Sequence, residues 1–298
     1  MARRKSKKKS SFITLAVAVL AIIAGAISYF GGAFDDNSVP VNADSGFSVH
    51  FIDVGQGSST LIQAGTKGVL IDAGESEYGQ GVCDYIRSCG VSELSCVILT
   101  HQHSDHMGGM LQVLKSYKVG KFYMPELLDK TVPTTRLYEN LLDILADKNI
   151  DAQYAEPGNE FTFSNASFTF IGPVKKVDDL NNMSLVTRIV YGKTSFLICG
   201  DAEKTEMKTL VKTPYTLKSD IYLMSHHASS TGIYENFLNL VSPRVAIISC
   251  GEDNSYGHPH KEALNYIKNN SIKSYRTDTQ GSIVVTCTDT GYTIKTEK

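Results

Sequence analysis

The sequence predicts an α/β fold in which two β-sheets are flanked by helices. Three observations lead to this prediction. Short strand-like runs recur throughout residues 46–298, segments with helical periodicity lie between them, and several polar motifs come directly after a strand-like run. Helices interleaved with this many strands favour sheets that are covered by helices. Loops on such a rigid scaffold commonly carry function, so the polar motifs are the candidate functional segments.

The predicted strands are short and mostly apolar, and they lie at 50–54, 59–62, 69–72, 96–100, 121–124, 161–163, 167–171, 185–191, 194–199, 220–225, 246–250, 282–287 and 293–295. The predicted helices show apolar residues at the helical period, and they lie at 80–88, 107–116, 134–146, 203–211, 234–240 and 261–268. The motifs extend through all of these elements, so residues 46–298 are expected to form one large domain.

The N-terminus predicts export and a membrane anchor. The first ten residues carry six basic side chains and no acid, and residues 12–30 are uncharged and nearly all apolar. A helix of about 20 apolar residues can cross a bilayer, and flanking positive charge keeps its N-terminal side in the cytoplasm. We therefore expect a cytoplasmic tail at 1–11, a transmembrane segment at 12–34 and a polar linker at 35–45.

A cleaved signal peptide is the competing interpretation, because Ala24-Gly25-Ala26 resembles a small-residue cleavage site. The apolar run is longer than the 7–15 residues of a usual signal peptide, which favours the uncleaved anchor. The anchor predicts a single-pass protein of the cell membrane with an extracellular catalytic domain. Cleavage predicts a secreted protein, so both interpretations place the domain outside the cell.

The charge balance bears on DNA binding, and the positions of the cysteines bear on disulfide formation. The net charge is −2, and removing the six N-terminal basic residues leaves 23 Lys and Arg against 31 Asp and Glu, or −8. Tight binders of long DNA usually show a basic patch instead, so this balance counts against them. The six cysteines lie in apolar runs or at an unsuitable helical spacing, and we expect them to be free packing residues rather than disulfides.

A metal site is predicted by the run THQHSDH at residues 100–106, which has the pattern H-x-H-x-D-H. Imidazole nitrogen and carboxylate oxygen are ligands that zinc favours. Side chains two apart in an extended chain point the same way, so His101 and His103 can bind one ion. The helical run that follows would turn Asp105 and His106 toward a second ion. A polar loop that holds three histidines by chance is the alternative, but the chain has only eight.

The same run and four other motifs resemble the metallo-β-lactamase-fold hydrolases, and within them the hydrolase domain of ComEC-type competence proteins. The other motifs are FIDVGQG at 51–57, LIDAG at 70–74, CGDAE at 199–203, SHHAS at 225–229 and NSYGHPH at 254–260. The phosphorylcholine esterases of bacterial surfaces are similar to that branch. The resemblance covers residues 46–297 and implies a four-layer αββα sandwich with two bound divalent ions, Zn²⁺ as the expected metal and Mn²⁺ as the alternative.

The resemblance also implies roles for single residues. Asp201 would bridge the two ions, although Asp is also a favoured N-cap for a helix that starts after it. Of the pair His226 and His227, one ring would complete the second site. His226 is the preferred ligand, and His227 remains open as the alternative. His258 would act in its protonated form on the leaving group, while Asp105 would orient the nucleophile.

Departures from the family pattern affect the first ion and the substrate contacts. No histidine occurs between residues 107 and 200, where many members of the superfamily supply a ligand, and Asn181-Asn182 falls near that position. Ser58 and Ala228 stand where the subfamily usually has Asp and Gly. We expect a weaker first metal, and we expect substrate contacts from residues with amide, hydroxyl or imidazole groups: Asn182, Ser229 and His260.

The predicted function is a membrane-anchored extracellular phosphodiesterase. Its substrate would be DNA, a surface polymer or a small phosphodiester, and no protein partner can be inferred. Hydrolysis of a β-lactam is a competing enzymatic function, disfavoured by the missing histidine. A DNA-binding or surface-binding protein on a non-catalytic scaffold is the other alternative, and it predicts eroded metal ligands, whereas the ligands here are intact.

Overall fold

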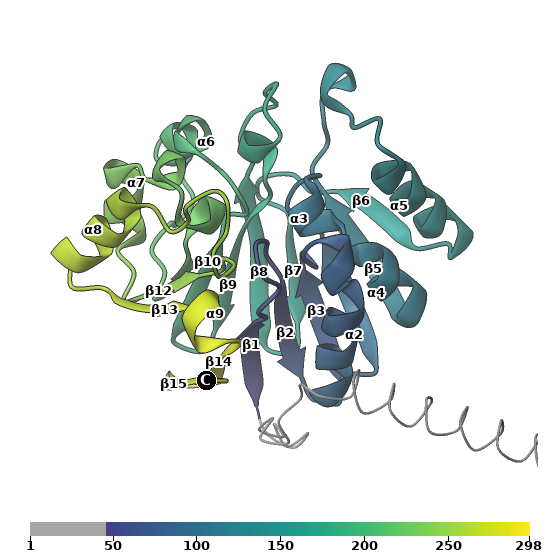
Figure 1. The fold of residues 1–298 in the computed structure, drawn as a ribbon, viewed down its shortest axis with the longest axis horizontal. Coiled ribbons are helices and arrows are strands. Elements are labelled where there is room, and N and C mark those ends of the chain that lie inside the picture. The colour runs from purple at the N-terminus through teal and green to yellow at the C-terminus, as the bar shows by residue number, and fades with distance from the viewer. Residues whose placement is uncertain (1–45) are drawn as a thin grey trace, which may run out of the picture. The chain divides into compact units, whose positions relative to one another are not determined.

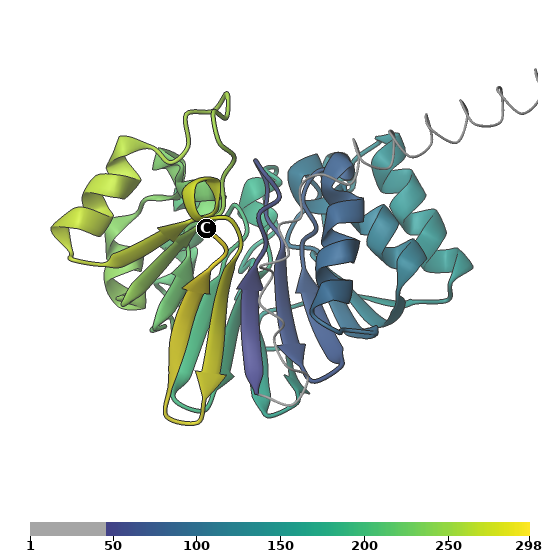
Figure 2. The ribbon, with the colours of Figure 1, turned by 60° about the horizontal axis from the view of Figure 1, so that its bottom comes forward.

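The computed structural model describes residues 46–298, which form two β-sheets packed face to face (Figure 1). The first sheet has eight strands in the order β15-β14-β1-β2-β3-β4-β5-β6, and the second has seven in the order β13-β12-β11-β10-β9-β8-β7. Figure 2 shows β14 beside β1 and β15 on the far side of β14, so the C-terminal end of the domain completes the sheet that the N-terminal end begins.

The strands run as follows: β1 (Phe47–Phe51), β2 (Thr60–Ala64), β3 (Lys67–Ile71), β4 (Glu93–Ile98), β5 (Lys118–Met124), β6 (Asp151–Tyr154), β7 (Glu160–Phe163), β8 (Ala166–Gly172), β9 (Val186–Tyr191), β10 (Thr194–Ile198), β11 (Ile221–Leu223), β12 (Val245–Ile248), β13 (Lys273–Arg276), β14 (Ile283–Thr288) and β15 (Gly291–Thr296). The helices are α2 (Gly79–Ser88), α3 (Ser104–Met107), α4 (Met110–Ser116), α5 (Arg136–Asp147), α6 (Lys204–Leu210), α7 (Glu235–Val241), α8 (Lys261–Asn269) and α9 (Thr277–Gln280).

Alternating side chains build the layers. In β3, Val69 and Ile71 face the other sheet, while Leu70 packs under helices α2 and α4. In β10, Phe196 and Leu197 divide in the same way between the inter-sheet core and the helices α6 and α7. Because successive strand residues point to opposite faces, an apolar strand can be buried on both sides. The result is a sandwich with helices on the outer face of each sheet, as predicted.

The described structure contains every strand predicted from the sequence, and it adds β6 and β13. Both added strands lie toward the edges of their sheets and are mostly exposed or half-buried, so they lack the apolar pattern that marks the central strands. The six cysteines are free and buried, as expected.

The prediction of a single helix at 107–116 is wrong. The chain forms two helices there, α3 and α4, with Gly108 and Gly109 between them. A Cβ on Gly109 would lie 2.1 Å from the carbonyl oxygen of Ala73, and one on Gly108 would lie 2.3 Å from the backbone nitrogen of Ser76. Only glycine permits this approach of two backbones. The approach holds the segment after residues 100–106, the predicted metal-binding run, against the loop that follows β3.

No helix in the described part of the chain is long and apolar enough to cross a bilayer. The predicted tail at 1–11, the transmembrane segment at 12–34 and the linker at 35–45 lie outside the described residues.

The loops that carry the motifs leave their strands at the same end. Strands β3 and β4 pair in parallel in one sheet, and β10, β11 and β12 pair in parallel in the other. Parallel neighbours place their carboxyl ends side by side, so the segments after these strands meet at one edge of the sandwich. The candidate site is built there.

Candidate metal centre

The H-x-H-x-D-H loop connects β4 to α3 and brings its first two histidines together. Nε2 of His101 lies 3.0 Å from Nδ1 of His103. His101 is fully buried, whereas His103 reaches the cavity. The extended backbone of this loop thus places the two rings on one side, as the spacing predicts.

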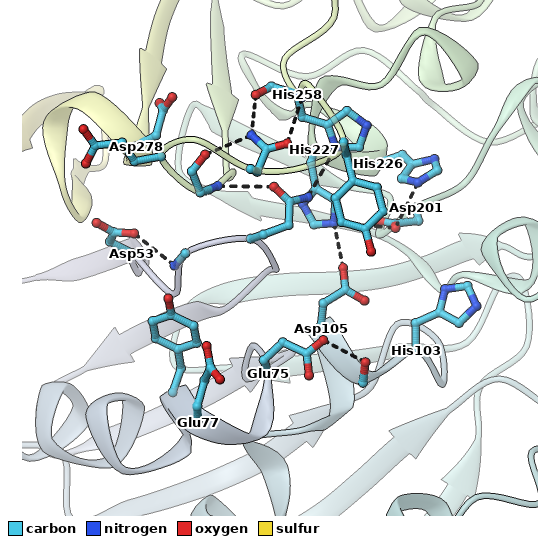
Figure 3. A pocket seen from close by; sticks show the side chains of 18 of the residues that line it. Asp53, Glu75, Glu77, His103, Asp105, Asp201, His226, His227, His258 and Asp278 are labelled. Carbon is cyan, nitrogen blue, oxygen red and sulfur yellow. Dashed lines mark hydrogen bonds and ion pairs between the residues drawn. The ribbon is translucent and has the colours of Figure 1, made fainter.

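A second group of ligand atoms lies next to this pair. One side-chain atom from each of Asp105, His106, Asp201 and His227 lies within 4.8 Å of all the others. Asp105 and His106 belong to α3, Asp201 follows β10, and His227 follows β11. Figure 3 shows the carboxylate of Asp105 extending toward His227. Four candidate ligands from three separate segments therefore converge on one point.

Asp201 lies between the two groups. Its Oδ1 is 3.2 Å from Nε2 of His106, and its Oδ2 is 3.9 Å from Nε2 of His101 and 3.6 Å from Nε2 of His227. The alternative role as a helix N-cap is excluded, because α6 begins at Lys204 and its N-cap residue is Glu203. One carboxylate thus faces both sets of imidazoles, which is the position of a bridging ligand.

The two histidines after β11 have different hydrogen-bond partners. Its Nδ1 donates to the carbonyl oxygen of Ser249 at 2.9 Å, which leaves Nε2 to face Asp105 at 3.1 Å. His226 instead directs Nδ1 toward Thr231 at 3.0 Å and Glu203 at 3.1 Å. Nε2 of His226 lies 3.7 Å from Oδ2 of Asp201, so His226 stays a candidate ligand. The close group of candidate ligand atoms contains His227, which favours His227 over the preferred His226.

The local backbone explains how adjacent histidines reach different places. His226, His227 and Ala228 have φ values of 52°, 54° and 63°, the left-handed region that non-glycine residues seldom adopt. Strain of this kind is concentrated at functional sites. It also gives a physical reason for the glycine that the subfamily usually carries where this chain has Ala228.

Asp72 belongs to the site, although the motif LIDAG predicted no role for it. This fully buried carboxylate lies 2.7 Å from Nδ1 of His106 and accepts hydrogen bonds from the backbone and hydroxyl of Thr100 at 2.8 and 2.7 Å. A carboxylate on one nitrogen of a histidine fixes the ring so that the other nitrogen can bind a metal. The sequence feature that could have identified Asp72 is its position directly after the apolar run 69–71.

The residues present fit a divalent metal ion. Nε2 of His106 is buried and makes no hydrogen bond, although it lies 3.2 Å from Asp201. Buried polar atoms normally have partners. Burial alone would lower the pKa of His106, but Asp201, Asp72 and Asp105 outweigh it and raise the pKa well above its usual value. The ring of His106 is therefore surrounded by negative charge. A cation bound at Nε2 would give this unpaired nitrogen a partner and would also neutralise charge on the carboxylates.

Burial would likewise raise the pKa of Asp201, but the nearby His106 and His227 hold it well below its usual range. Asp201 is therefore a carboxylate at neutral pH. For His101, burial and the neighbouring His106 lower the pKa well below 6.5. His101 is accordingly neutral, which is the form of imidazole that coordinates a metal.

His258 lines the cavity beside this cluster, with its ring 5.9 Å from that of His227 between centroids. Burial, together with His227, His226 and His260, lowers the pKa of His258 to about 4. The ring is therefore neutral at physiological pH. Burial and the three surrounding histidines thus favour a neutral His258 over the protonated form expected from the sequence.

The three predicted substrate contacts are not among the residues that line the cavity. The side-chain oxygen of Asn182 accepts from the backbone of Glu203 and Glu206 at the start of α6. The hydroxyl of Ser229 accepts from the backbone of Thr231, and Nδ1 of His260 accepts from that of Ser230. These side chains support the loops, and Asn181, the neighbour of Asn182, reaches the cavity wall instead.

The cavity over the ligand cluster has a volume of about 840 Å³ (Figure 3). Beyond the ligand cluster, its wall carries carboxylates and one lysine, with two tyrosines: Asp53, Glu75, Glu77, Glu252, Asp278, Lys298, Tyr78 and Tyr256. The five carboxylates, Lys298 and Tyr78 were not assigned to the site from the sequence. The wall is thus strongly acidic around a centre that collects histidines and two carboxylates.

Known proteins share both the sequence pattern and the fold. Residues 52–252 match the family model of the metallo-beta-lactamase superfamily. ComE operon protein 3 of Bacillus subtilis is 29% identical over 254 residues, which cover 79% of this chain and 32% of that protein. Competence protein ComA of Neisseria gonorrhoeae is 29% identical over 266 residues, covering 88% and 34%. The chain therefore spans about a third of the length of these curated relatives.

Two solved structures share the fold at low sequence identity. CmlA, a diiron β-hydroxylase from Streptomyces venezuelae, aligns with a TM-score of 0.56 at 12% identity over 82% of this chain and 54% of that one. The metallo-beta-lactamase fold protein YhfI from Bacillus subtilis aligns with a TM-score of 0.54 at 13% identity over 85% and 100%. These two curated relatives are competence proteins of the ComEC type, and the chain belongs to the metallo-beta-lactamase superfamily.

Proposed function

We propose that the protein is a binuclear-metal phosphodiesterase. The observation that carries this proposal is the position of Asp201, whose carboxylate lies within 3.9 Å of His101 from one group of candidate ligands and of His106 and His227 from the other. A carboxylate shared between two groups of candidate ligands could help to hold two divalent ions. Such a pair can stabilise both the attacking and the leaving oxygen of a phosphodiester.

The proposed ligands divide into two groups around Asp201. His101 and His103 would hold one ion with it, and Asp105, His106 and His227 would hold the other. The nitrogen and oxygen donors suit Zn²⁺, with Mn²⁺ as the alternative. When bound, the two ions would lower the pKa of a water molecule toward neutrality and offset charge on the phosphoryl group.

The protein's own side chains have distinct tasks in this reaction. Asp105 lines the cavity, and His106 and His227 keep its pKa below the usual range although burial opposes this, so it stays a carboxylate that can orient an attacking water. Asp72 and Ser249 hold His106 and His227 by their Nδ1 atoms. His258 lies on the cavity wall and can contact the leaving oxygen. No covalent protein nucleophile is needed.

The acidic wall favours a small phosphodiester over long DNA. Outside the proposed ligands, five carboxylates face the cavity against one lysine. A polyanion that extends past the metal centre would meet this negative wall, whereas a small diester would present only its phosphate to the ions. Affinity for long DNA comes mainly from basic residues that release counterions. DNA remains the second candidate substrate, because the curated relatives are named for competence and recombination.

Rates on two substrates test this proposal. The full-length protein, reconstituted with Zn²⁺ or Mn²⁺, should cleave a chromogenic phosphodiester with little change between about 50 and about 200 mM salt. DNA cleavage should be slow and should fall steeply over this range, as contacts to many phosphates do. Substituting glutamine for Glu75 and Glu77 should raise the rate on DNA and leave the small diester unaffected.

Rapid DNA degradation at the higher salt, with negligible turnover of small diesters, would establish a nuclease instead. If the metal-loaded protein turns over neither substrate, a β-lactam assay then separates that enzymatic alternative from a non-catalytic binding protein.

We also propose that the N-terminal segment anchors this domain outside the cell. The support is the basic run at 1–11 followed by the uncharged run at 12–30. The full-length protein should sediment with membranes, and protease added to intact cells should digest the domain. Recovery in the soluble cytoplasmic fraction, protected from added protease, would contradict both the anchor and the signal-peptide interpretations.

A further inference from the structure

Gln56 makes two contacts that determine how its amide is oriented. Its Oε1 lies 3.3 Å from the backbone nitrogen of Gly251, and its Nε2 lies 3.2 Å from Nδ1 of His258. A backbone N–H can only donate, so the atom facing Gly251 is the amide oxygen. The amide nitrogen therefore faces His258, and the amide cannot be reversed without placing two donors against each other.

The protonation of His258 follows from this orientation. An amide nitrogen can only donate, so Nδ1 of His258 accepts and carries no proton. A neutral imidazole holds its single proton on the other nitrogen. Nε2 of His258 is then an N–H donor. Among residues 46–298 we find no hydrogen-bond acceptor for it, and His258 lines the cavity that contains the metal ligands (Figure 3).

The surrounding backbone holds both partners in place. A Cβ on Gly251 would lie 2.7 Å from the backbone nitrogen of Gln56, so glycine is required for the two segments to approach. The side chain of Asn254 accepts from the backbone nitrogen of His258 at 3.0 Å and donates to its carbonyl oxygen at 2.6 Å. The ring of Tyr256 stacks on that of His258, with 5.6 Å between centroids and 14° between planes.

We propose that Gln56 is a positioning residue that holds His258 as a neutral imidazole with its proton on Nε2, where it donates a hydrogen bond to the leaving oxygen of the substrate. The tautomer follows from the hydrogen bonds alone, and its catalytic use rests on the proposed phosphodiesterase function. The proton stays on Nε2, and no covalent bond to His258 forms or breaks. Preorganised donors of this kind stabilise charge as it develops on an oxygen.

Substituting glutamate for Gln56 reverses the tautomer. One carboxylate oxygen still accepts from Gly251, and the other then requires a proton on Nδ1 of His258, which removes it from Nε2. Substituting methionine for Gln56 keeps the length of the side chain. It removes the hydrogen bonds to Gly251 and His258 without imposing either tautomer on His258. The three proteins, full-length and labelled with ¹⁵N-histidine, should be compared with and without Zn²⁺ at about pH 8.5, two pH units above the ordinary histidine pKa of about 6.5.

The ¹⁵N spectrum of the wild-type protein should show His258 protonated at Nε2 and unprotonated at Nδ1, and Gln56→Glu should reverse this. Activity should be measured on a nitrophenyl and on a phenyl phosphodiester. Since the poorer leaving group needs the donor more, Gln56→Glu should lose about 100-fold in kcat on the phenyl ester, a typical cost of removing one such donor, and clearly less on the nitrophenyl ester. The kcat of Gln56→Met on the phenyl ester should lie between that of the wild type and that of Gln56→Glu.

A wild-type His258 protonated at Nδ1 would overturn the proposal. Equal losses on both esters would overturn its catalytic part, since a purely structural defect affects both alike. If the wild type hydrolyses neither ester while its spectrum shows the expected tautomer, the phosphodiesterase function fails and the assignment of the tautomer stands.

Discussion

Asp201→Asn should abolish turnover and release bound metal, with the largest effect of any single substitution in the site. Asparagine preserves the shape of the side chain and removes the charge that faces His101, His106 and His227. Mutation of an outer partner of a metal site typically costs about 10- to 100-fold in affinity or activity. Loss of the shared carboxylate should exceed this range, because it weakens both groups of ligands at once. Elemental analysis and steady-state rates measure the two effects.

Asp143→Asn is a suitable control, since Asp143 lies on the exposed face of α5, away from the cavity. It loses the same charge and should retain both metal and activity. Circular dichroism should show that both variants are folded. A folded Asp201→Asn protein that binds metal and turns over substrate like the wild type would rule out the bridging role.

The adjacent histidines offer a second, internally matched comparison. His227→Ala should lose one ion per chain and lose turnover, because Nε2 of His227 faces Asp105 and Asp201. His226→Ala removes a ring that contacts Thr231 and Glu203, so the protein should keep its metal content even if its rate falls. Metal content measured after equal exposure to a chelator distinguishes the two. The reverse pattern would assign the ligand to His226.

The part of the candidate site that lies within one short segment of the chain could be predicted from the sequence. His101, His103, Asp105 and His106 lie within six residues, and the extended-to-helical backbone that orients them is encoded in the same loop. The central strands were predictable for a similar reason, because burial on both faces leaves an apolar run. The strands β6 and β13 were missed because they are exposed or half-buried and therefore carry no apolar run.

Other features depended on backbone geometry or on distant contacts. The left-handed backbone at 226–228 directs His227 toward Asp105 and His226 toward Thr231 and Glu203, and no local pattern predicted that conformation. Asp72 is identified as part of the site only by its contact with His106, and Gln56 only by its contact with His258. Residues separated by 34 and 202 positions are paired by the packing of the sheets, which local periodicity does not encode.

The separation of the ligands along the chain makes the metal a structural cross-link. Asp105 and His227 are 122 residues apart and belong to segments that leave different sheets. An ion bound to both would close a loop of that length and reduce the conformational entropy of the unfolded chain that retains it. A covalent bridge across a loop of about 100 residues contributes about 4–5 kcal/mol in the chain-entropy model. With its cysteines all free, the domain would gain from the proposed metals a cross-link between its two sheets, in addition to the apolar core that packs them together.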